Sequence, residues 1–133
     1  MTAAADTNIW VRYLTNDDPD QGRRVLAWLA SVHQVVVPVT VIPELEWVLR
    51  AAYRLDRAAV NAGLRQVVGL PMVTTDHAEA VATALAAHEE GVDFADALHA
   101  ALCPPGVPLT TLDRRLIKRN GVAGLQVQAM PRS

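Results

Sequence analysis

The stretch VVVPVTVIPELEWVLRAAY, residues 35–53, contains the pattern on which the fold prediction depends. Its first three residues, Val35-Val36-Val37, are β-branched and apolar, which is typical of a short buried strand. Between residues 41 and 53 the apolar positions recur at helical spacing, and Thr40 stands where a helix N-cap is expected. A buried strand that leads directly into an amphipathic helix indicates a βαβ unit with parallel strands.

The same alternation extends over the rest of the chain. Further strands are predicted at residues 2–6, 72–74, 109–111 and 125–129, the first of them mainly because a helical pattern follows it. Further helices are predicted at residues 21–31, 58–68, 77–89 and 94–102, with N-caps at Asp56, Asp76 and Asp93. Strands that alternate with helices in this way predict an α/β fold, a three-layer α/β/α domain with a central, mostly parallel sheet.

Length and composition indicate a single globular domain, residues 1–133. Hydrophobic residues make up 51% of the chain, which excludes a disordered protein. Cys103 is the single cysteine and cannot form an intramolecular disulfide, so a reducing compartment is expected. The N-terminal residues do not resemble a signal peptide, and no apolar run is long enough to cross a bilayer. We therefore expect a cytoplasmic protein without a membrane segment.

Four acidic residues either follow a predicted strand or lie near the start of a helix that is expected to face the strand ends. They are Asp6, Glu44, Asp96 and Asp113. The carboxyl ends of parallel strands meet at one edge of a sheet, where functional groups collect. Carboxylates gathered there would repel one another without a counter-ion, and oxygen ligands suit Mg²⁺ or Mn²⁺. Such an ion can activate water and stabilise charge at a phosphodiester, so the pattern indicates metal-assisted hydrolysis.

The residues around these acids resemble the PIN-domain family, and in particular the VapC-type toxins of toxin–antitoxin pairs. Four motifs carry the resemblance: Asp6-Thr7-Asn8-Ile9-Trp10, Pro43-Glu44-Leu45, Asp93-Phe94-Ala95-Asp96-Ala97-Leu98-His99-Ala100 and Thr110-Thr111-Leu112-Asp113-Arg114. They occur in the family's order and span nearly the whole chain. Four motifs in this order are more specific than any one of them. The alanine-rich first strand and Leu112 depart from the family pattern but leave the acids in place.

The resemblance implies an endoribonuclease that depends on Mg²⁺ or Mn²⁺. It implies three metal-binding acids, a fourth and less regular acid, and supporting polar residues. Asp6, Glu44 and Asp96 match the three metal-binding acids, and Asp113 matches the fourth. The supporting polar residues are Thr7, Asn8 and Thr111. The implied substrates are structured RNAs such as tRNA or ribosomal RNA loops.

The resemblance also implies partner proteins. They are a second copy of the chain in a homodimer and a cognate antitoxin whose C-terminal segment covers the acidic pocket. An exposed apolar groove would be the physical sign of the antitoxin site, and Val11, Leu14 and Trp47 are the candidates for it.

A basic run directly follows the last acid. Its members are Arg114, Arg115, Lys118 and Arg119. These side chains can hold RNA phosphates, although a run of charge is more often a solvated helix face. The net charge of −2 is low for a nucleic-acid binder, but carboxylates around a cation would account for part of the negative charge.

Structural interpretations stand beside the functional ones. Asp6 and Asp113 can each serve as an N-cap, and Asp93 is expected to cap the helix that carries Asp96. Capping and metal binding are compatible, because a capped helix start would aim Asp96 at the site. Glu46 is expected to pair with Arg50, four residues later on the same helix. His99 fits a surface or packing role, and Cys103 a buried, inert one.

Two rival functions come from other classes of protein. A receiver-type phosphoacceptor domain also has an acidic Mg²⁺ site, but it needs an acidic pair after the first strand, where Asp6 is alone. A PIN fold that binds RNA or protein without catalysis is the second rival. The presence of all four acids argues against it, although acids kept for metal-dependent folding would look the same. An Asp96→Asn variant that stays folded separates these possibilities.

Overall fold

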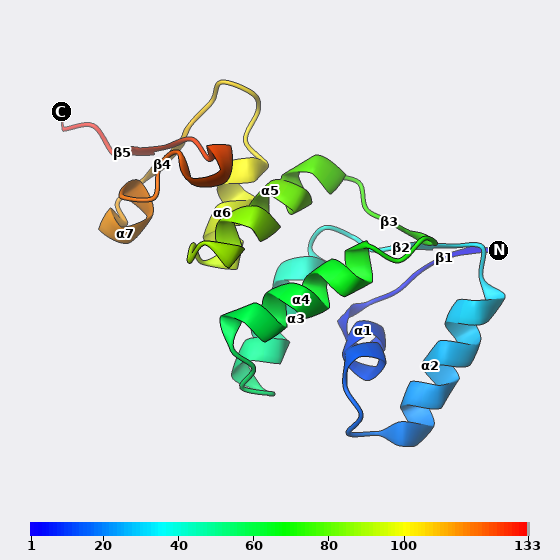
Figure 1. The fold of residues 1–133 in the computed structure, drawn as a ribbon. Helices are drawn as coiled ribbons and strands as arrows, with labels where there is room; N and C mark the ends of the chain where they lie inside the picture. Colours follow the sequence, from blue (N-terminus) through cyan, green and yellow to red (C-terminus); the bar gives the residue numbers. More distant parts are fainter. Residues whose placement is uncertain (133) are drawn as a thin grey trace. The chain divides into compact units, whose positions relative to one another are not determined.

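The structure is a computed structural model that describes residues 1–132 and divides into two compact units. The first unit, Met1–Asp76, contains β1 (Thr2–Ala4), α1 (Thr7–Leu14), α2 (Pro19–Ser31), β2 (Gln34–Val36), α3 (Val41–Ala51), α4 (Arg57–Val68) and β3 (Val73–Thr74) (Figure 1). The second unit begins at His77 and contains α5 (Ala78–Glu89), α6 (Phe94–Ala101), β4 (Leu109–Thr111), α7 (Arg114–Ile117), the 3₁₀ turn η1 (Val122–Gly124) and β5 (Val127–Ala129). The helices and strands predicted from the sequence are all present, with ends that differ by a few residues.

The first unit is built on a three-stranded parallel sheet in the order β1-β2-β3. Ala3 lies opposite Val35, and Val35 lies opposite Val73. The backbone ladder continues past the end of β1, where the Ala5 N–H donates to the Val36 carbonyl at 3.2 Å. Because each strand returns in the same direction through helices, the βαβ interpretation of residues 35–53 is confirmed.

The core of this unit lies where α1, α3 and α4 pack together. Trp10 of α1 is fully buried, and Leu64 of α4 is 1% exposed. On α3 the buried side chains are Ile42, Leu45 and Leu49, which follow the helical spacing expected from the sequence. This packing gives α3 one buried face.

The prediction that Val11, Leu14 and Trp47 form an exposed apolar groove is wrong. Val11 is buried because α1 packs against both α2 and α3, and Leu14 is half-buried. Trp47 lies on the outer face of α3 with 57% of its surface exposed. These three side chains therefore do not form one exposed surface.

The second unit packs α5 against α6, which are joined by a tight turn at Gly91. Phe94 and Leu98 of α6 are buried, and the Phe94 ring lies edge-on to the buried His88 at 5.7 Å between ring centroids. β4 and β5 form a separate parallel pair in which Leu109 lies opposite Val127. Among residues 1–132 every strand pairing is thus parallel, as predicted, but the strands form two sheets, one in each unit. No helix in this range is both long and apolar enough to cross a membrane.

Two of the four predicted N-caps form the expected side-chain hydrogen bond. Asp56 accepts from the Ala59 N–H at 2.8 Å, and Asp93 accepts from the Asp96 N–H at 3.1 Å. Thr40 occupies the cap position of α3 in a helical backbone conformation, and within the described chain its hydroxyl makes no capping bond. The prediction for Asp76 is wrong, because His77 occupies the cap position and Asp76 precedes it by one residue.

The two aspartates provide a matched pair of variants. Asp56→Ala should lower the free energy of unfolding by about 1 kcal/mol, because the first turn of α4 loses the acceptor for its Ala59 N–H. Asp76→Ala should change it by less than about 0.5 kcal/mol, since this exposed carboxylate caps no helix. Urea denaturation followed by circular dichroism measures both values. Equal losses for the two variants would contradict the assignment of the caps.

Candidate functional site

Asp6 stands between β1 and α1, where the chain leaves the sheet. It is the N-cap of α1, and its Oδ1 accepts from the Ile9 N–H at 3.5 Å. The side chain is exposed, Thr7 beside it is buried, and Asn8 is exposed in the first turn of α1. The prediction that Asp6 caps a helix is therefore confirmed. The cap uses Oδ1 of the carboxylate, and Oδ2 remains open to a ligand.

Glu44 lies in the first turn of α3 and is also exposed. α1 and α3 follow the neighbouring parallel strands β1 and β2, and the two helices pack against each other. The helix starts that carry Asp6 and Glu44 therefore lie at the same carboxyl edge of the three-stranded sheet. Glu46, two residues later and on a different face of α3, is buried and accepts from the Arg50 Nε at 2.8 Å, as predicted.

Asp96 lies in the first turn of α6, the helix capped by Asp93. Its side chain is half-buried. Burial raises the pKa of Asp96 above its ordinary value of 3.8, and the negative charges of Asp93 and Asp113 raise it further, while His99 lowers it. Sequence reasoning gave Asp93 only a capping role, although the Asp-x-x-Asp spacing across a helix start was the signal that their charges interact.

Asp113 follows β4 and caps the short helix α7. Its Oδ1 accepts from the N–H groups of Arg115 at 2.9 Å and Leu116 at 3.4 Å. The Thr111 hydroxyl accepts from the Asp113 N–H at 3.0 Å and fixes the turn after the strand. In the second unit, Asp96 and Asp113 thus form a pair of interacting carboxylates at a strand end and a helix start.

The four predicted acids share an electrostatic property. Within residues 1–132, none of them forms an ion pair with a basic side chain. No three His, Cys, Asp or Glu side chains in that range are gathered closely enough to hold a metal ion. Asp6 and Glu44 belong to the first unit, whereas Asp96 and Asp113 belong to the second, where the charge of Asp113 acts on Asp96. Carboxylate oxygens are the ligands that hard divalent cations prefer, and basic side chains do not occupy these four.

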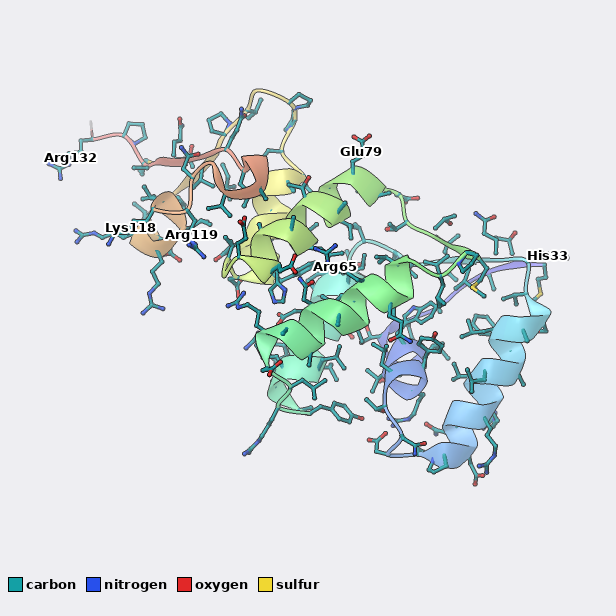
Figure 2. All side chains as sticks on the ribbon, in the orientation of Figure 1. His33, Arg65, Glu79, Lys118, Arg119 and Arg132 are labelled. Carbon is teal, nitrogen blue, oxygen red and sulfur yellow. The ribbon has the colours of Figure 1, made fainter. Side chains whose placement is uncertain are left out.

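The basic residues after Asp113 differ in their availability. Arg114, Arg115 and Lys118 are exposed. Arg119 is half-buried, and its guanidinium donates to the Glu90 carbonyl in the turn between α5 and α6. Figure 2 shows Lys118 and Arg119 at the end of α7. A Cβ added at Gly91, which has a φ of +107°, would meet the Arg119 guanidinium.

Two smaller expectations concern His99 and Cys103. His99 is exposed, in line with a surface role. Cys103 is half-buried rather than buried, because it lies in the loop after α6, where its thiol donates to the His99 carbonyl at 3.3 Å.

The interaction between Asp96 and Asp113 has a measurable pH dependence. Because the folded state raises the pKa of Asp96, it binds the proton more tightly than the unfolded chain does. The free energy of unfolding should therefore fall as the pH rises from about 4 through the folded-state pKa. In EDTA at neutral pH, Asp96→Asn should raise the free energy of unfolding by less than about 1 kcal/mol, since solvent screens this partly exposed group.

The matching NMR experiment titrates the Asp96 carboxyl carbon in EDTA. Asp113→Asn should lower the pKa of Asp96, because one of the negative charges that raise it is removed. A titration midpoint that stays the same in Asp113→Asn would show that the two carboxylates do not interact.

The sequence was compared with known families and proteins. The sequence model of the PIN domain matches residues 3–120, a range that contains both units' acids. No curated protein matches the chain. PIN domains are generally nucleases, typically depend on a divalent metal, commonly bind RNA and often pair with antitoxins. The match confirms the predicted α/β/α fold class, and the parallel strand pairings agree with it. The chain therefore belongs to the PIN-domain family.

Proposed function

We propose that this chain is a metal-dependent endoribonuclease whose metal-binding acids, for Mg²⁺ or Mn²⁺, are Asp6, Glu44, Asp96 and Asp113. The observation that carries the proposal is the set of four acids without basic partners, each at a helix start or strand end, in a PIN-domain chain. A structural role alone would leave the charge of Asp96 opposed by burial and by two neighbouring carboxylates. A cation would reverse that penalty.

The capping bonds support this proposal because they fix the direction of two carboxylates. Asp6 and Asp113 each use Oδ1 for backbone N–H groups, which leaves Oδ2 for a cation. Thr111 holds the turn that carries Asp113, while Thr7 and Asn8 flank Asp6. A bound divalent cation would supply activation of water and stabilisation of charge at the phosphodiester. The chain's own residues would hold and orient it, and no covalent protein nucleophile is required.

We further propose that the two compact units act as one PIN domain, residues 1–133. The family match supports this, because it runs from residue 3 to residue 120 across the boundary at Asp76. The motif resemblance further supports a VapC-type toxin that forms a homodimer. Its proposed partners are a cognate antitoxin and structured RNA such as tRNA or ribosomal RNA loops. The single free cysteine supports action in the reducing cytoplasm.

The proposal predicts RNA cleavage that needs both the metal and the acids. The purified chain should cleave cellular RNA with Mg²⁺ or Mn²⁺ and stop in EDTA. Asp6→Asn and Asp96→Asn should each lower the cleavage rate by at least about 100-fold, because losing a ligand should exceed the 10- to 100-fold effect typical of a ligand's supporting partner. Asp56→Asn is the matched control, since asparagine still caps α4 and this residue lies outside the proposed site. Its rate should equal that of the unaltered chain.

Two outcomes would change the assignment. A folded, metal-binding chain that cleaves no RNA would favour a binding module without catalysis. Additive losses of Mg²⁺ affinity in the Asp6→Asn, Asp96→Asn double variant would mean that the acids of the two units bind separate ions. Non-additive losses would indicate one shared site.

The exposed basic residues after Asp113 predict a salt-dependent RNA affinity. Arg114→Ala, Arg115→Ala and Lys118→Ala should each reduce the slope of log affinity against log salt by about 1, if each side chain contacts one phosphate. Arg119→Ala should mainly destabilise the second unit, because its guanidinium is engaged with the Glu90 carbonyl. Fluorescence anisotropy with labelled RNA in EDTA measures the slopes. Unchanged slopes in the three variants would show that these basic side chains are a solvated surface and do not contact RNA phosphates.

A further inference from the structure

A cavity of about 430 Å³ in the first unit has no role in the site described above. It is lined by three residues of α1 and four of α2, namely Asn8, Ile9, Arg12, Gln21, Arg24, Val25 and Trp28. The two helices pack side by side (Figure 1). The volume falls in the range of about 300–1,000 Å³ that is typical of sites for small ligands.

Arg12 is held in a fixed orientation at this cavity. Its Nε donates to the Gln21 Oε1 at 2.6 Å, and its Nη1 donates to the Asp17 Oδ1 and the Tyr53 hydroxyl, both at 3.3 Å. The Tyr53 hydroxyl in turn donates to the Asp17 Oδ2 at 2.5 Å. Hydrogen bonds from Tyr53 and Thr15 lower the pKa of Asp17 and keep it charged. The Nη2 group of Arg12 forms none of the hydrogen bonds found among residues 1–132, so a ligand can accept from a preorganised donor.

Arg24 supplies a positive charge that is not neutralised. It is exposed, and within the described residues it forms no ion pair. Its neighbour Arg23 is also exposed but is ion-paired with Asp20 and does not line the cavity. The charge of Arg24 is therefore available to an anion at the cavity, whereas that of Arg23 is partly used.

The remaining lining residues form an apolar and aromatic wall. The Trp28 indole is half-buried, and Ile9 and Val25 stand beside it in the cavity lining. An aromatic face of this kind can stack with any nucleobase. Asn8 and Gln21 add side-chain amides, which can hydrogen-bond to polar groups of a base or ribose.

The cavity also lies next to the start of α1. Asn8 is two residues after Asp6, the acid that caps this helix. The lining therefore includes a residue of the first turn of α1, the helix that Asp6 caps.

We propose that this cavity is a subsite for one unpaired nucleotide of an RNA strand, with the base against Trp28 and a phosphate at Arg12 and Arg24. The inference rests on the proposed ribonuclease function and names the part of the substrate that the first unit recognises. An acidic peptide segment would also suit the two arginines. The compact volume, the single indole wall and the place beside Asp6 favour a nucleotide.

The test measures the affinity of the full chain for a short fluorescein-labelled oligoribonucleotide of mixed sequence in EDTA. Arg24→Ala should weaken binding by roughly tenfold, because a charged hydrogen-bond donor to phosphate is lost. Arg23→Ala, on the same helix and also exposed, should change affinity by less than about twofold, in line with the small effects of surface substitutions outside a site. Equal losses in the two variants would overturn the subsite, because only general surface charge would then attract RNA.

Tryptophan fluorescence locates the base independently. UMP, CMP, AMP and GMP should quench the fluorescence of the unaltered chain and of Trp47→Phe, but quenching should be lost in Trp28→Phe. Trp47 is exposed and lies outside the cavity, so it serves as the matched control. Quenching that persists in Trp28→Phe and disappears in Trp47→Phe would overturn the proposal. So would Arg24-dependent binding of a Glu-rich peptide without binding of any nucleotide.

Cleavage assays with Mg²⁺ separate this inference from the proposed function. If the unaltered chain cleaves RNA and Arg24→Ala cleaves with the same KM and kcat, the nuclease stands and the subsite fails. If the unaltered chain cleaves nothing but binds the oligoribonucleotide through Arg24 and Trp28, the subsite stands and the nuclease fails.

Discussion

Repulsion between carboxylates is the constraint on which the proposed site depends. Asp113 directly follows β4 and Asp96 lies in the first turn of α6, so the backbone fixes the position of each carboxylate. Asp96 shows the result, since burial and the charges of Asp93 and Asp113 all oppose its ionisation. Lysine or arginine partners would relieve this repulsion, but among residues 1–132 the four acids have none. A divalent cation would remove the repulsion and at the same time provide the chemistry that a nuclease needs.

Helix capping explains how such acids can keep their positions when no cation is present. Asp6 and Asp113 each bond to the backbone at the start of a helix, so their directions are set by secondary structure. Asp93 does the same for the helix that carries Asp96. Structural and functional interpretations of these residues are thus not alternatives. The same hydrogen bonds that satisfy a helix end hold one oxygen of a carboxylate and leave the other one outward.

The sequence predicted the elements because hydrophobic spacing and turn residues are local signals. Ile42, Leu45 and Leu49 are buried on one face of α3, and Glu46 pairs with Arg50 on the same helix. Predictions failed where the answer depended on packing between helices. Val11 and Trp47 both look like apolar helix residues, yet Val11 is covered by neighbouring helices and Trp47 is not. The cap at Asp76 failed because a shift of one residue at the start of α5 moved it out of reach.

The candidate acids could be read from the sequence, since each follows a predicted strand or lies at the start of a predicted helix and matches a family motif. The cavity between α1 and α2 could not, because Arg12 and Gln21 meet only when the two helices pack. The division of the strands into two sheets likewise reflects pairings between distant segments, which periodicity does not encode.

The turn between α5 and α6 links two positions that are far apart in the chain. Gly91 has a left-handed backbone, and the space where its side chain would stand is filled by the guanidinium of Arg119. The glycine therefore serves both the turn and the arginine that reaches the Glu90 carbonyl. In related sequences that keep this turn, position 91 should therefore remain glycine even where residue 119 is short, because a φ of +107° strains any larger residue.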